Sequence, residues 1–157
     1  MPLMSRKADY ALLILWYLNQ QQSGGCARAI AGEFRLSRPF VANILKELCQ
    51  KGFVASHRGV KGGYQLQRPV AEISLAELIE TLDVSFRLCE CNQAAPGEGC
   101  ALLPICPIQS AIEGVHRRVY EVLRGVTLAE LFHTGGRGRG PGDLQMLSLR
   151  QPAGALN

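Results

Sequence analysis

The sequence predicts a mainly α-helical fold with one small β-hairpin. Apolar residues recur every three or four positions over residues 39–49 and again over residues 108–123, which is the spacing of amphipathic helices. Between these segments, two short strand-like runs flank the glycine-rich residues 59–63, a pattern typical of a hairpin. Of the 157 residues, 47% are hydrophobic, which is enough for a packed core. We therefore expect one small domain followed by a long helix.

The N-terminal third predicts three helices. Residues 10–18 are apolar on nearly every face, so we expect a largely buried helix there. A short helix follows over 27–34, and Ser37 then serves as the N-cap of a helix over 39–49, with Pro39 in its first turn. Two short helices joined by a tight turn form a helix-turn-helix unit. The second helix of such a unit can enter the major groove of DNA.

The predicted hairpin follows the third helix directly. Residues 53–56 and 64–66 form its strands, and Arg58 and Lys61 lie at its tip. A narrow basic hairpin can reach into the minor groove, so we expect a winged helix-turn-helix; the alternative is an ordinary hairpin with a flexible tip. The residues of the third helix expected to face base edges or phosphates are Ser37, Arg38, Pro39, Phe40, Asn43 and Lys46.

The charge distribution favours a polyanionic partner. The net charge is +4, but residues 1–70 carry ten Lys or Arg against three acidic residues, a net +7. Residues 71–110 carry one Arg against six acidic residues, a net −5. A basic N-terminal half suits double-stranded DNA, because each neutralised phosphate releases condensed counterions. An excess of this size is also found on ordinary solvated surfaces, so charge supports DNA binding without establishing it.

The second half predicts a short helix over 73–82, a Cys-, Gly- and Pro-rich loop over 86–107 and a long helix over 108–123. The long helix carries one apolar stripe, formed by Ile108, Ile112, Val115, Val119 and Leu123. We expect this stripe to pack against its copy in a homodimer, whose two-fold axis would match a palindromic operator. The alternative is that the stripe covers the domain's own core.

Four regions are therefore expected. They are a winged helix-turn-helix domain at 1–85, a cysteine-rich loop at 86–107, a dimerisation region at 108–133 and a disordered tail at 134–157. The dimerisation region ends in a short amphipathic segment at 126–132.

Some protein classes are excluded by what the sequence lacks. No apolar run is long enough to span a bilayer, and no signal peptide is evident, so we expect a cytoplasmic protein without membrane binding. His57, His116 and His133 are scattered, and no nucleophile with a matching base is present. We therefore do not expect an enzyme.

The six cysteines fall into two groups. Cys26 and Cys49 lie in or beside helices and are interpreted as small buried hydrophobic residues. The other four are clustered and are Cys89, Cys91, Cys100 and Cys106. Because the cytoplasm keeps thiols reduced, the cluster predicts either an iron–sulfur site, a thiol–disulfide switch or a zinc site. Zinc is the least favoured, since paired CxxC knuckles are missing.

Three features together resemble the winged-helix iron–sulfur transcription regulators represented by IscR, NsrR and RirA. Residues 56–66 (SHRGVKGGYQL) resemble the wing signature of that family, and residues 7–12 resemble the start of its first helix. Three cysteines before a long helix complete the likeness. The resemblance adds four residues to the expected DNA-binding wing: His57, Gly59, Gly62 and Tyr64. The start of the chain and the wing look closest to members that regulate SUF cluster-assembly genes.

The resemblance implies a homodimeric transcription regulator whose operator binding depends on a 4Fe–4S or 2Fe–2S cluster and responds to iron–sulfur status, oxidative stress or nitric oxide. It assigns Cys91, Cys100 and Cys106 as cluster ligands. Gln109 stands where IscR-type members have a histidine, which argues against their 2Fe–2S site. The fourth ligand is then either Asp9 from the other subunit, as in NsrR-type members, or Cys89. Two rival hypotheses remain: a thiol-based redox-sensing repressor without a cluster, and a zinc- or cluster-stabilised interaction protein.

Overall fold

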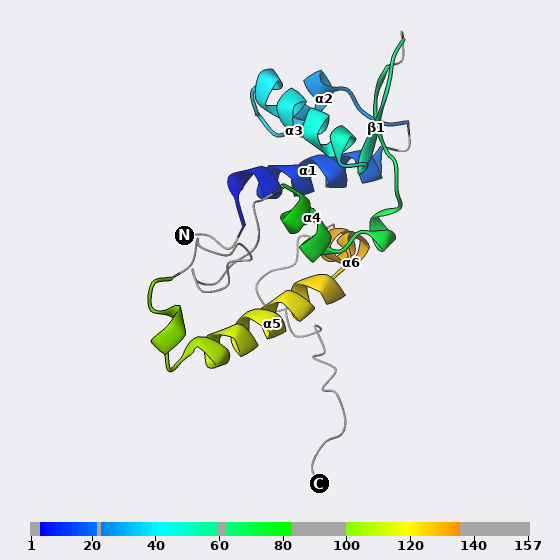
Figure 1. The fold of residues 1–157 in the computed structure, drawn as a ribbon. Helices are drawn as coiled ribbons and strands as arrows, with labels where there is room; N and C mark the ends of the chain where they lie inside the picture. Colours follow the sequence, from blue (N-terminus) through cyan, green and yellow to red (C-terminus); the bar gives the residue numbers. More distant parts are fainter. Residues whose placement is uncertain (1–3, 22, 60–61, 83–99, 136–157) are drawn as a thin grey trace.

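The computed structural model describes residues 4–21, 23–59, 62–82 and 100–135 of the 157-residue chain. The elements in chain order are α1 (Arg6–Gln20), α2 (Ala27–Glu33), α3 (Arg38–Gln50), β1 (Val54–His57), β2 (Gly63–Leu66), η1 (Val70–Glu72), α4 (Leu75–Leu82), η3 (Leu103–Ile105), α5 (Gln109–Gly125) and α6 (Leu128–Gly135). The expected mainly α fold with one small hairpin is confirmed (Figure 1). Apart from its first two residues, which belong to α6, the predicted disordered tail lies outside the described residues.

Helix α1 supports the helix-turn-helix unit. The Ser5 Oγ accepts a hydrogen bond from the Ala8 N–H at 3.2 Å, and this cap starts the helix four residues before the apolar run that predicted it. The helix buries one broad face, formed by Ala8, Ala11, Ile14, Leu15 and Leu18. Leu13 remains 39% exposed, so α1 is not buried on every face.

A tight turn joins α2 to α3. Arg35 adopts a left-handed φ of 52°, and the Leu36 N–H donates to the Ala31 carbonyl at 2.9 Å. This bond closes the end of α2 in the manner of a Schellman motif. Ser37 occupies the N-cap position of α3, as predicted, although its side chain makes no capping hydrogen bond. The two helices therefore form the expected helix-turn-helix.

The two strands pair antiparallel, with Val54 opposite Leu66 and His57 opposite Gly63. Phe53 and Val54 are buried at the base of the hairpin. The hairpin rises beside α2 and α3, and its tip extends beyond the helices (Figure 1). The wing is therefore fixed at its base and exposed at its tip.

Residues 126–135 pack on the winged domain. The Leu128 N–H donates to the Ile73 carbonyl at 2.9 Å, and Leu128 and Phe132 are buried in the same hydrophobic core as α1 and α3. A reciprocal capping box starts α6, because the Thr127 and Glu130 side chains each accept the other residue's N–H. The sequence grouped this segment with the dimerisation region; in the structure Leu128 and Phe132 lie in the winged core.

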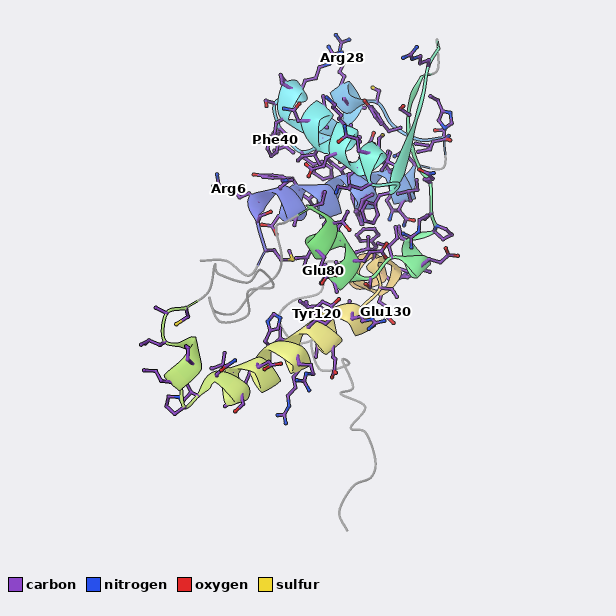
Figure 2. The ribbon with its side chains drawn as sticks, viewed as in Figure 1. Arg6, Arg28, Phe40, Glu80, Tyr120 and Glu130 are labelled. Carbon is purple, nitrogen blue, oxygen red and sulfur yellow. The ribbon has the colours of Figure 1, made fainter. Side chains whose placement is uncertain are left out.

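The first half of helix α5 extends away from this core (Figure 1), and none of the α5 residues is buried. Its second half lies against α4, where partial burial and then the neighbouring Glu80 carboxylate raise the pKa of Tyr120 (Figure 2). Ile108 and Val115 of the predicted stripe are 59% and 49% exposed, and its other three residues are half-buried. The described part of the chain therefore leaves part of the predicted stripe uncovered.

No helix in the described part of the chain has the length and apolar content needed to cross a bilayer.

Candidate DNA-binding surface and cysteine site

The exposed face of α3 carries the side chains predicted to meet DNA. Its opposite face packs into the core through Val41, Ile44, Leu45 and Leu48. All six predicted residues of this region are exposed or partly exposed: Ser37, Arg38, Pro39, Phe40, Asn43 and Lys46. Because the core residues fix the rotation of α3 about its axis, they also fix which side chains face outward.

Phe40 is only partly available at this surface. Its ring meets the Tyr10 ring of α1 edge to face, with centroids 5.0 Å apart and planes at 89°, and the residue is 37% exposed. Edge-to-face packing is a favourable aromatic geometry. Phe40 therefore holds the N-terminal end of α3 against α1 in addition to presenting an edge outward.

Glycines place the wing close to the connection between α1 and α2. Gly25 and Tyr64 exchange two backbone hydrogen bonds, at 2.9 and 2.8 Å. A Cβ at Gly63 would lie 2.9 Å from the Gly25 carbonyl oxygen, and a Cβ at Gly24 would lie 2.6 Å from the Tyr64 carbonyl oxygen. Both distances are shorter than ordinary contact, so the backbones approach this closely only where side chains are absent.

The predicted wing residues divide by exposure. His57, Arg58 and Gly59 are exposed, Gly62 and Tyr64 are half-buried, and Lys61 lies outside the described residues. Tyr64 packs against the core while its backbone pairs with Gly25, so it supports the wing from below. Of the described wing residues, the exposed group is the most accessible to a ligand.

Arg28 is a basic residue of this surface that the sequence reasoning did not assign. It is exposed near the start of α2, and Figure 2 shows it extending away from the body of the molecule. The first helix of a helix-turn-helix crosses the DNA backbone. A basic residue at the start of that helix was therefore the signal that could have identified it.

Lys7 connects three helices. From the first turn of α1, its Nζ donates to Glu47 Oε1 of α3 at 3.0 Å and to the Leu82 carbonyl at the end of α4 at 2.9 Å. The chain then continues from Leu82 toward the cysteines. The same turn of α1 carries Asp9, which is exposed.

Two of the predicted cluster ligands are described. Cys100 and Cys106 are half-buried free thiols on either side of η3, whereas Cys89 and Cys91 lie outside the described residues. Partly shielded thiols fit an iron–sulfur cluster, which takes thiolate ligands and is tuned by solvent exposure. Within the described ranges no three potential metal ligands lie together. The match of Cys100 and Cys106 to a cluster therefore rests on the chemistry of their thiols.

The remaining cysteines have structural positions. Cys26 is exposed and caps α2, its Sγ accepting from the Ala29 N–H at 3.4 Å; the expectation that it is buried was wrong, because its place before the helix uses the sulfur as a cap. Cys49 is half-buried, and burial raises the pKa of its thiol. A neutral thiol is a poor nucleophile and a poor metal ligand.

The comparison with known families decides the classification, because residues 4–134 match the family described as Rrf2, iron-dependent transcriptional regulator. The chain belongs to the Rrf2 family. A Geobacillus kaustophilus relative, the HTH-type transcriptional regulator NsrR, is 29% identical over 131 residues, which cover 82% of this chain and 88% of the relative.

Two solved structures are similar to this Rrf2 protein. T. potens IscR superposes with a TM-score of 0.64 over 87% of this chain and 92% of that one, and its 24% identity limits the likeness to the fold. The oxidized form of Staphylococcus aureus CymR is 28% identical, with a TM-score of 0.63 over 84% of this chain and 96% of that one. The winged-helix fold expected from the sequence is thus confirmed.

This Rrf2 protein is a DNA-binding transcription regulator. Its relatives are named as transcription regulators, which are not enzymes, in agreement with the expectation from the sequence. The resemblance to the NsrR and IscR group is confirmed at the level of the family and the fold.

Proposed function

We propose that this Rrf2 protein is a cytoplasmic homodimer that binds a palindromic operator under the control of an iron–sulfur cluster held by its cysteine segment. The observation that carries the proposal is the place of Cys100 and Cys106. In the chain, these half-buried thiols lie between α4, which is tied to the DNA-binding unit through Lys7, and α5, none of whose residues is buried. A group bound there would be linked through the chain to both helices.

In this proposal, α3 contacts base edges in the major groove, and the wing contacts the DNA phosphate backbone or the minor groove. Arg38 and Asn43 can make bidentate contacts with guanine and adenine edges, while Lys46 and Arg58 can neutralise phosphates. The supporting residues of this surface are Ser37, Pro39, Phe40, His57, Gly59, Lys61, Gly62 and Tyr64.

The DNA assignment is tested with a duplex selected from a random pool by the parent protein. Arg58→Ala should weaken binding to specific and nonspecific duplexes alike and lower the salt-dependence slope by about one. Asn43→Ala should instead relax sequence preference at one position, with a loss of about 1–3 kcal/mol. Arg117→Ala, on exposed α5, is the control. Unchanged salt dependence in Arg58→Ala would refute the wing contact.

The homodimer is proposed to form through α5. An exposed amphipathic helix needs a partner surface, and a second copy of the same stripe supplies one by two-fold symmetry. Residues 108–125 would then be the dimerisation region, between the cysteine loop at 86–107 and residues 126–135, which pack on the winged domain.

Cys91, Cys100 and Cys106 would hold the cluster, with either Asp9 of the second subunit or Cys89 as the fourth ligand. When bound, the cluster would supply sensitivity to iron, oxidants and nitric oxide. The Cys100 and Cys106 thiols that would hold it are half-buried and lie between α4 and α5 in the chain, and Asp9 lies in the first turn of α1. Asp9 is exposed, as a residue that reaches another subunit must be.

Anaerobic loading with ferrous iron and sulfide tests this assignment. The parent should gain visible absorbance with matching iron and sulfide content, and Cys106→Ser should lose it while keeping the same circular dichroism. Cys26→Ser is the matched control and should load normally. Asp9→Ala and Cys89→Ala, compared side by side, identify the fourth ligand by which of them loses cluster. A colourless, iron-free parent would refute the proposal.

A second candidate function is thiol-based redox sensing without a cluster. It is favoured by the likeness to Staphylococcus aureus CymR, whose solved structure is of an oxidized form. In that case peroxide should change operator binding of the iron-free parent, and Cys100→Ser with Cys106→Ser should abolish the change. Insensitivity of the iron-free parent to peroxide would remove this candidate.

A further inference from the structure

The Lys7 ammonium forms a bridge between the recognition helix and the end of α4. One hydrogen bond reaches Glu47 Oε1 of α3 at 3.0 Å, and a second reaches the Leu82 carbonyl at 2.9 Å. The Lys7 and Glu47 side chains are 41% and 30% exposed, so neither group is free to sample the solvent on all sides. A single side chain thus contacts α3 and α4 from α1.

The Leu82 carbonyl lies in the last described turn of α4. A cation near the C-terminal end of a helix is favoured by the helix dipole. Leu82 is 4% exposed and packs in the hydrophobic core. From this residue the chain leads in sequence toward the cysteines.

The other end of the bridge lies on the helix that faces DNA. Glu47 is one turn beyond Asn43 on α3, and positions four residues apart share a helix face. The Tyr10 ring holds the N-terminal part of α3 through Phe40. Beside the shared core, α1 contacts α3 through the Tyr10 ring and through Lys7, and Lys7 also contacts α4.

We infer that Lys7 is a positioning residue that couples the cysteine segment to α3. A shift of the end of α4 moves the Leu82 carbonyl and with it the Lys7 ammonium. The movement of the ammonium then weakens or strengthens its hydrogen bond to Glu47. The biological meaning of this coupling rests on the proposed control of DNA binding by the cysteine segment, whereas the bridge itself is testable in the iron-free protein.

Hydrogen exchange of the iron-free protein tests the bridge. Glu47→Gln should speed exchange of the last-turn amides of α4 by about two- to fivefold, the size of a partly exposed ion pair, although the substitution is in α3. Lys7→Met should do the same, and adding Glu47→Gln to it should have no further effect. Lys7→Arg, which can donate to both acceptors, should restore slow exchange. Unchanged α4 exchange in Glu47→Gln, or additive effects of the two substitutions, would overturn the inference.

Operator affinity separates this inference from the proposed function. The ratio of dissociation constants between the iron-loaded and iron-free forms should shrink by about two- to tenfold in Lys7→Met and be retained in Lys7→Arg. An equally large ratio in Lys7→Met refutes the coupling while leaving cluster control intact. A ratio of one in the parent, together with the exchange coupling above, refutes cluster control while leaving the bridge intact.

Discussion

Substitution of Gly63 by alanine should detach the wing from the helices. The new Cβ would lie 2.9 Å from the Gly25 carbonyl oxygen and 3.2 Å from the Gly25 carbonyl carbon, and these backbone atoms cannot rotate away as a side chain would. Separating them breaks the two hydrogen bonds that Gly25 and Tyr64 exchange. At about 0.5–1.5 kcal/mol net for each bond, the free energy of unfolding should fall by about 1–3 kcal/mol.

Gly32→Ala is the matched control for this experiment. Gly32 lies in α2, and a Cβ added there would meet no atom within 4 Å, so alanine should be neutral or stabilise by up to about 1 kcal/mol. Urea denaturation at one fixed protein concentration measures both variants, and fluorescence anisotropy with a labelled duplex measures DNA affinity. Gly63→Ala should also weaken DNA binding, because the wing loses its support. A Gly63→Ala protein as stable as Gly32→Ala would refute the reasoning.

The core, the thiols and α5 each give one further prediction. Leu128→Ala should lower the free energy of unfolding by about 2–5 kcal/mol, whereas His133→Ala, exposed on the same helix, should change it by less than about 0.5 kcal/mol; equal effects in urea denaturation would contradict the packing of α6. Iodoacetamide at neutral pH should modify Cys26 several-fold faster than Cys49, because a raised pKa keeps the Cys49 thiol neutral until the pH rises toward it; peptide mass spectrometry would disprove this by finding Cys49 modified first. Val115→Glu should convert the dimer to monomer in sedimentation velocity while Arg117→Glu should not, and a dimeric Val115→Glu protein would exclude the α5 interface.

Local signals in the sequence were sufficient for the helix-turn-helix and the wing. Ser37 and Pro39 marked the start of α3, and the periodic apolar residues after them placed its end within one residue of the observed Gln50. The hairpin was equally clear, because glycines and short β-prone runs determine such turns locally. These elements depend on neighbours in sequence, which is why their positions could be read directly.

Features that depend on distant residues were not predictable in the same way. The apolar face of α6 could pack on a partner or on its own core with the same pattern, and only its contact with the winged core decides between them. The pairing of Tyr64 with Gly25, which ties the wing to the connection between α1 and α2, also could not be read from the local pattern. Lys7 binds Glu47 and Leu82, which lie 40 and 75 positions further along the chain. No local sequence pattern predicts such contacts.

The most direct test of the central claim is the operator affinity of one protein preparation measured before and after anaerobic loading with ferrous iron and sulfide. The parent should change its dissociation constant by at least about fivefold, the lower end of ordinary allosteric coupling, and Cys100→Ser with Cys106→Ser should show one constant under both conditions. Equal affinities for the loaded and iron-free parent would contradict control of DNA binding through the cysteine segment.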